Sequence, residues 1–296
     1  MTYALLRPTM YRAPGTSLRS VVHRQLDVIS STSQNEVYVE KFTDNREGVA
    51  YLTMNRPVGK NSFSKNFLAQ FEHCLQTLKS ERTIRVVVMR SLVPGVFCAG
   101  ADLKERRAMS EEEVEPFVER LRSAASALEG LPMPTIAAID GVALGGGLEM
   151  ALACDMRIAS PSAKMGLVET KLAIIPGAGG TQRLPRIVGP VLAKELILTS
   201  RILDGIQAGA IGLVNHVTDT NETAEQRALK LADEMLPNGP IALRLAKLAI
   251  NKSLEVSLTE GLMFEKNFYK QLIKTKDRLE GLNAFNEKRK PLFKGE

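Results

Sequence analysis

The sequence is poor in the side chains that build metal sites and disulfide frameworks. Its three cysteines, Cys74, Cys98 and Cys154, are far apart and form no CxxC pair. Its three histidines are equally scattered, and there is no HExxH motif. A disulfide framework and a Cys-rich zinc site are therefore not indicated, and we expect no metal in this protein.

Long apolar runs are also absent. The most apolar stretch, Ile136–Ala153, is interrupted by Asp140 and Glu149, so no segment reaches the roughly 18 apolar residues of a membrane-spanning helix.

Positive charge is not widespread along the chain either. The net charge is +6, but four arginines and one aspartate give residues 1–33 a net +3. The remaining chain is only mildly basic, which gives little indication of nucleic-acid binding.

Residues 1–33 are rich in arginine, serine and threonine and contain a single acidic residue. This composition predicts a mitochondrial transit peptide that is removed on import to the matrix. A secretory signal would need an apolar run of about 7–15 residues, which this segment lacks. A disordered basic arm is the alternative. On either interpretation we exclude residues 1–33 from the fold.

From about residue 36 the hydrophobic pattern predicts strands that alternate with helices. Strands are expected at 37–39, 49–52, 84–89, 134–139 and 156–159, and helices at 64–79, 110–129 and 148–153. After about residue 220 only helices are expected, at 224–235, 241–253, 259–274 and 276–287. The pattern predicts an α/β core with a mostly parallel sheet over 34–220, followed by a helical block over 221–296.

Two segments rich in small residues stand where a predicted strand passes into a helix. Phe97–Glu105 reads FCAGADLKE, and Gly141–Glu149 contains three consecutive glycines. Such turns leave backbone N–H groups free at a helix N-terminus, where negative charge is stabilised, although each could also be an ordinary tight turn. Neither segment matches the GxGxxG or P-loop patterns of nucleotide sites.

Two glutamates lie in apolar surroundings near glycine-rich turns. Glu149 is flanked by apolar residues in Leu148–Ala153, and Glu169 precedes the turn that contains Pro176–Gly180. A buried carboxylate must be paired, hydrogen-bonded or functional. Alternatively, Glu149 complements a helix dipole and Glu169 lies at the surface. Together, the turns and glutamates could form an oxyanion hole with general acid–base groups for an activated carbonyl. No nucleophile elbow is present, so covalent acyl transfer is not indicated.

Taken jointly, these motifs resemble those of the crotonase (enoyl-CoA hydratase/isomerase) superfamily over residues 36–296. The matching segments are Asn55–Pro57, Phe97–Asp102, Ala143–Glu149, Cys154–Asp155, Ile175–Leu184 and Asp277–Leu282, with Phe285 and Lys288. The resemblance implies a spiral of ββα units. It also implies that the C-terminal block is a trimerisation region that covers a neighbouring subunit, in a trimer or a dimer of trimers.

The resemblance also implies site residues. The oxyanion hole would be formed by the N–H groups of Ala101 and Gly146, and the catalytic pair would be Glu149 and Glu169. The residues expected to bind substrate or CoA are Asp102, Leu103, Lys104 and Gly177, with Phe285 and Lys288 contributed by the adjoining subunit. No cofactor is expected, because CoA is part of the substrate.

Both glutamates are present, which favours hydration of a 2-enoyl-CoA. Residues 97–105, 164–176 and 275–282 resemble the mitochondrial 3-methylglutaconyl-CoA hydratase subgroup, which implies a role in leucine degradation. Several alternatives stay open: the related second type of enoyl-CoA hydratase domain-containing protein, a short-chain hydratase of fatty-acid β-oxidation, or another crotonase chemistry such as isomerisation or thioester hydrolysis.

A further alternative is an AU-rich RNA-binding protein with residual hydratase activity, since that subgroup also carries an RNA-binding name. Lys60, Lys65 and Lys79 remain in the segment concerned, but this segment is also an amphipathic helix whose lysines could simply face solvent. We expect RNA binding to be weak.

Overall fold

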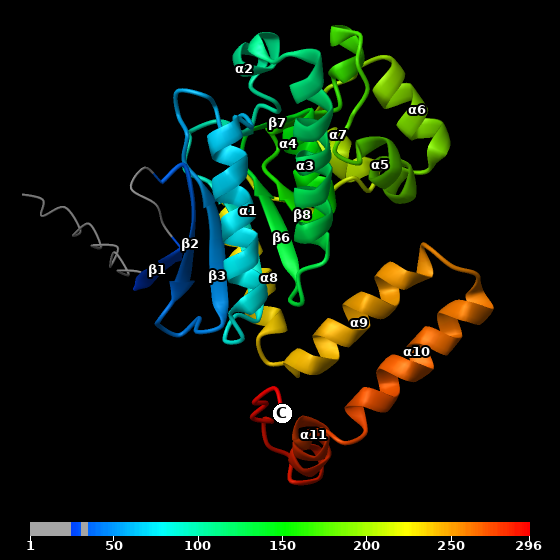
Figure 1. The fold of residues 1–296 in the computed structure, drawn as a ribbon. Helices are drawn as coiled ribbons and strands as arrows, with labels where there is room; N and C mark the ends of the chain where they lie inside the picture. Colours follow the sequence, from blue (N-terminus) through cyan, green and yellow to red (C-terminus); the bar gives the residue numbers. More distant parts are fainter. Residues whose placement is uncertain (1–24, 31–34) are drawn as a thin grey trace, which may run out of the picture.

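The computed structural model describes residues 25–30 and 35–296 (Figure 1). Its larger sheet has the strand order β1-β2-β3-β4-β6-β8-β11. The strands are β1 (Leu26–Ser30), β2 (Val37–Phe42), β3 (Val49–Met54), β4 (Val86–Ser91), β6 (Thr135–Ile139), β8 (Met156–Ala159) and β11 (His216–Val217). The first three pair antiparallel, and every pairing from β3 to β11 is parallel.

The central strands are buried on both faces, which explains their continuous apolar runs. Along β4, Val87 and Met89 belong to one core cluster while Val86 and Val88 belong to the other. Successive side chains of a strand point to opposite faces, so one apolar run supplies both cores. Helix α1 (Lys65–Ser80) contributes to the first cluster, and α8 (Ala224–Met235) contributes to the second.

A smaller sheet has the order β10-β9-β7-β5. Its strands are β5 (Val96–Cys98), β7 (Val142–Leu144), β9 (Lys164–Gly166) and β10 (Leu203–Asp204). Along the chain, β4 leads to β5, β6 to β7 and β8 to β9, and each pair is followed by helices. This arrangement repeats a ββα unit, as the resemblance implies.

The helices that follow these strand pairs surround the smaller sheet (Figure 1). They are α2 (Leu103–Ala108), α3 (Glu111–Glu129), α4 (Gly146–Ala153), the short 3₁₀ helix η1 (Glu169–Leu172), α5 (Gly180–Val188), α6 (Pro190–Leu198) and α7 (Gly205–Ala210). The N-termini of α2 and α4 follow β5 and β7 closely, which places both glycine-rich turns at one end of the smaller sheet.

The C-terminal block consists of α9 (Pro240–Ser253), α10 (Leu258–Leu272) and α11 (Lys276–Asn286). Figure 1 shows α9 and α10 extending side by side away from the sheet. Helix α10 has no buried residue, and apolar side chains such as Leu258, Leu262 and Met263 are exposed. Large exposed apolar surfaces mark interaction sites, so this block is suited to packing on another subunit.

The α/β core and the C-terminal helical block are confirmed. The exclusion of residues 1–33 from the fold is wrong for Leu26–Ser30, because β1 pairs antiparallel with β2. Charge composition alone does not reveal a strand of five residues. Gln25 is described as well, and residues 1–24 and 31–33 lie outside the described part of the chain. Within the described part, no helix is both long and apolar enough to cross a membrane.

Candidate active site

The first glycine-rich turn leaves one backbone donor free beside α2. Gly100 adopts a positive φ of 98°, which favours glycine. Its carbonyl accepts a hydrogen bond from the Phe63 N–H at 2.7 Å, and the Asp102 N–H donates to the Phe63 carbonyl at 3.1 Å. The intervening N–H of Ala101 has no backbone acceptor in the described chain. It is therefore available to a ligand.

The second donor is the N–H of Gly146, the first residue of α4, which has no acceptor within the helix. The next residue, Gly147, must be glycine, because a Cβ there would lie 2.2 Å from the Cys98 carbonyl oxygen. A Cβ on Gly146 would instead lie 4.0 Å from the Ala101 nitrogen and 4.0 Å from Glu149 Oε2. The two free N–H groups and Glu149 therefore border the same space.

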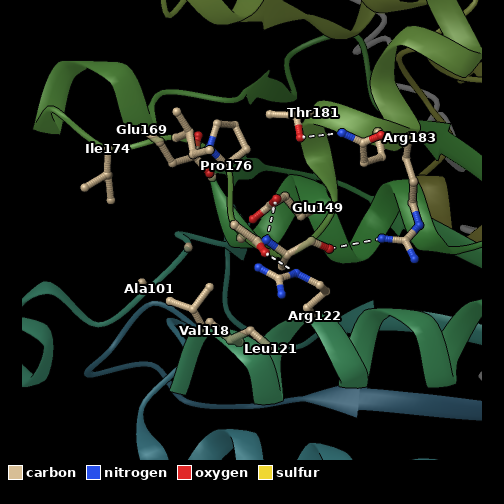
Figure 2. A pocket seen from close by; sticks show the side chains of 18 of the residues that line it. Ala101, Val118, Leu121, Arg122, Glu149, Glu169, Ile174, Pro176, Thr181 and Arg183 are labelled. Carbon is tan, nitrogen blue, oxygen red and sulfur yellow. Dashed lines mark hydrogen bonds between the residues drawn. The ribbon is translucent and has the colours of Figure 1, made fainter. Parts of the chain in front are cut away.

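Glu149 is buried and held by a loop that follows it in sequence. Only 3% of the residue is exposed, and its Oε1 accepts hydrogen bonds from the N–H groups of Ala178 at 2.8 Å and Gly180 at 2.7 Å (Figure 2). Burial raises the pKa of Glu149, although these N–H donors and the charges of Arg183 and Arg122 oppose the rise. The carboxyl group is thus fixed in position and destabilised as an anion.

Glu169, the first residue of η1, is 8% exposed, and neither of its oxygens has a hydrogen-bond partner in the described structure. Burial, and secondarily the charge of Glu149, raise the pKa of Glu169 to about 7. The alternative that Glu169 is a surface carboxylate is therefore wrong. Two carboxyls of perturbed pKa in one site are typical of acid–base catalysis.

Both glutamates open into a cavity of about 1040 Å³. Figure 2 shows that Val118, Leu121, Ile174 and Pro176 supply apolar walls around them. A cavity of this size, with mainly apolar walls and a few convergent polar groups, is suited to a small-molecule ligand.

Six of the residues implied by the resemblance line this cavity: Ala101, Leu103, Gly146, Glu149, Glu169 and Gly177. Asp102 and Lys104 do not line it. The Asp102 carboxylate caps α2 and forms an ion pair with Arg56 at 2.8 Å, while Lys104 is exposed.

Phe285 is 84% exposed on α11, and Lys288 follows that helix; neither lines the cavity of its own chain. Their contribution to a site in the adjoining subunit stays a prediction.

Several cavity residues were not identified from the sequence. They include Arg106, Arg122, Arg183 and Ala178. The Gly180 N–H, which does not line the cavity but holds Glu149, was not identified either. Arg183 belongs to the Ile175–Leu184 motif, which was a usable signal. Arg106 and Arg122 lie in charged helical segments, whose sequence indicates only a solvent-exposed helix face.

The cysteines are buried. Burial raises the pKa of Cys98 and of Cys154 to about 12, so neither thiol is activated as a nucleophile.

The fold and this site define a crotonase-type protein. Residues 44–296 match the family described as "Enoyl-CoA hydratase/isomerase", and the chain belongs to that family. It is 56% identical to rat mitochondrial methylglutaconyl-CoA hydratase, over 89% of this chain and 85% of the relative. It is 52% identical to mouse mitochondrial enoyl-CoA hydratase domain-containing protein 2, over 90% of this chain and 91% of the relative.

Among solved structures, the enoyl-CoA hydratase of Bacillus anthracis has a TM-score of 0.84 and 48% identity. The match covers 88% of this chain and 100% of that one. The expected crotonase fold is thereby confirmed.

Proposed function

We propose that this protein hydrates a 2-enoyl-CoA, with 3-methylglutaconyl-CoA of leucine degradation as its substrate. The observation that carries the proposal is the meeting of Glu149 and Glu169 with the free N–H groups of Ala101 and Gly146 in one cavity. The 56% identity to methylglutaconyl-CoA hydratase supports this choice of acyl group.

In the proposed reaction, the thioester oxygen accepts hydrogen bonds from the Ala101 and Gly146 N–H groups. Glu149 removes a proton from a water molecule as its oxygen bonds to C3, and the C2–C3 double-bond electrons move toward the thioester as an enolate. The two N–H groups stabilise that negative charge; one such donor typically contributes about 2.7–4 kcal/mol.

Glu169 then protonates C2, which completes the addition of water. Because its pKa is raised to about 7, Glu169 is available in both protonation states near neutral pH. Close carboxyls titrate as a pair, so the two glutamates can exchange proton roles between the forward and reverse reactions. No step of this proposed reaction uses a metal or a cofactor.

The remaining assignments extend this proposal. Leu103 and Gly177 contact the acyl-CoA within the cavity. Asp102 and Lys104 stay predicted CoA contacts, although neither lines the cavity. Phe285 and Lys288 approach CoA from an adjoining subunit in a trimer or a dimer of trimers. The exposed apolar side chains of α10 support self-association.

The proposed location is the mitochondrial matrix, supported by the mitochondrial relatives and the composition of residues 1–33. N-terminal sequencing of protein recovered from mitochondria tests the predicted cleavage near residue 30, which would remove β1; a mature N-terminus before Leu26 would instead keep β1 paired with β2. An intact N-terminus would contradict it.

The deciding experiment is hydration kinetics on a panel of enoyl-CoA esters that includes 3-methylglutaconyl-CoA and crotonyl-CoA. We expect the higher kcat/KM with 3-methylglutaconyl-CoA. A higher kcat/KM with crotonyl-CoA would instead assign the protein to the short-chain hydratases of fatty-acid β-oxidation. Isomerisation or thioester hydrolysis without hydration would overturn the reaction type.

A further inference from the structure

Among the four arginines that line the cavity, Arg106 alone has neither an ion pair nor a hydrogen bond from its side chain in the described structure; Arg186 forms no ion pair but donates to the Gln182 carbonyl at 2.8 Å. Arg183 pairs with Glu129 at 2.7 Å, and Arg122 pairs with Glu119. Arg106 forms no ion pair with any described carboxylate, and its Nη1 is buried without a hydrogen-bond partner in the same part of the chain. This nitrogen is an unsatisfied donor at the wall of the reaction cavity.

Helix geometry directs Arg106 toward the cavity. Leu103 and Arg106 are three residues apart on α2, so they share a helix face, and both line the cavity. Lys104 lies on a different face and is exposed. The Arg106 guanidinium carbon also lies 5.4 Å from the centre of the Phe117 ring of α3. The cation is therefore supported over an aromatic ring, on the same side of α2 as the cavity.

An arrangement of this kind is costly without a ligand. A buried donor that forms no hydrogen bond loses its hydration without compensation. Burial also lowers the pKa of Arg106, the direction expected when a cation loses water and gains no anion. A carboxylate from the substrate would remove both penalties, because guanidinium–carboxylate pairs form strong charge-assisted hydrogen bonds.

The proposed substrate carries such a group at a suitable place. In 3-methylglutaconyl-CoA the distal carboxylate is two bonds beyond C3, the carbon that water attacks. With the thioester at Ala101 and C3 near Glu149, that carboxylate must remain in the cavity that Arg106 lines. The phosphates of CoA are separated from the thioester by the whole pantetheine arm, which places them farther from this wall.

Building on the proposed function, we propose that Arg106 binds the distal carboxylate of the acyl chain and thereby selects a dicarboxylic over a monocarboxylic enoyl-CoA. A monocarboxylic substrate such as crotonyl-CoA would leave Nη1 unpaired. Arg106 is thus a specificity-determining residue, distinct from the catalytic glutamates.

The test uses three variants of the full chain. Arg106→Met removes the charge from an unbranched side chain, Arg106→Lys retains a charge without the planar fork, and Arg107→Met is a matched control at the next, exposed residue. The readout is the ratio of kcat/KM for 3-methylglutaconyl-CoA to that for crotonyl-CoA, which cancels any difference in folded fraction. We expect the ratio to fall about 100-fold in Arg106→Met, about 10-fold in Arg106→Lys, and not at all in Arg107→Met.

Competitive inhibition supplies a second arm that needs no turnover of the proposed substrate: glutaryl-CoA carries a distal carboxylate, butyryl-CoA lacks it, and CoA carries only the phosphates. Selective weakening of glutaryl-CoA inhibition of crotonyl-CoA hydration in Arg106→Met would support the assignment. Equal weakening of all three inhibitors would show that Arg106 serves the phosphates or the fold, and would overturn it.

An unchanged substrate ratio in Arg106→Met would also overturn the assignment. A wild-type enzyme that prefers crotonyl-CoA would refute the proposed function instead. The inhibitor comparison would then still decide whether Arg106 binds a carboxylate.

Discussion

Glu169 offers a prediction about stability that needs no substrate. Burial and the charge of Glu149 raise the pKa of Glu169 from an ordinary 4.5 to about 7 in the folded protein. The folded state therefore holds this proton more tightly than the unfolded chain. The resulting stabilisation is complete below about pH 4.5 and is lost as pH rises through about 7. At about 1.36 kcal/mol for each pKa unit, ionising Glu169 costs the folded protein about 3 kcal/mol.

Glu169→Gln removes the charge while keeping the side chain's size and polar atoms. Relative to wild type, the free energy of unfolding of this variant should increase by roughly 2–3 kcal/mol between about pH 5 and pH 8.5. Any fixed cost of placing an amide in the same position cancels in that difference. The variant should nonetheless lose at least about 10²-fold in kcat, because a proton-transfer group is gone.

Urea unfolding at the two pH values, on wild type and variant, measures this effect. Glu115→Gln, at an exposed position of α3, is the matched control and should show no such pH dependence. If the stability difference between wild type and Glu169→Gln is the same at both pH values, the reasoning about Glu169 is refuted. Turnover close to wild type would separately remove Glu169 from the proposed mechanism.

Three further predictions concern the site and its surroundings. Glu149→Gln should keep the fold and lose at least about 10²-fold in kcat, measured by steady-state hydration of crotonyl-CoA. Gly147→Ala should lower the free energy of unfolding by about 1–3 kcal/mol, because its Cβ would lie 2.2 Å from the Cys98 carbonyl oxygen; Gly146→Ala has space and should reduce kcat while retaining stability in thermal unfolding. Weak RNA binding is expected in a mobility-shift assay with AU-rich RNA at about 150 mM salt, where contacts to phosphate are screened; submicromolar affinity abolished by Lys65→Ala would contradict it.

Local sequence pattern was sufficient for much of the fold. The β-branched run in β4 predicts a strand buried on both faces, and the apolar spacing of α1 predicts an amphipathic helix. Both follow from the period of a single element, and neither depends on distant residues. The capping pair Ser110 and Glu113 likewise marks the start of α3, where the Glu113 carboxylate accepts from the Ser110 N–H at 3.1 Å.

The short elements were not predictable in this way. Strands β5, β7 and β9 have three residues each, too few for a period to show, and they gain their hydrogen bonds from one another across the smaller sheet. The five-residue strand β1 is likewise defined by its pairing with β2, while its surroundings have the composition of a targeting segment.

In the candidate site too, some residues could be predicted from local sequence, and others depend on tertiary packing. Glu149, Glu169 and the glycine-rich turns could be selected from sequence because apolar flanks and consecutive glycines are local signals. The roles of Arg106 and of the Ala178 and Gly180 N–H groups could not be predicted from sequence, because each role depends on which groups from other segments lie nearby. Whether a carboxylate receives two backbone hydrogen bonds, as Glu149 does, or none, as Glu169 does, is set by long-range packing. That packing gives the two chemically identical side chains different hydrogen-bonding environments.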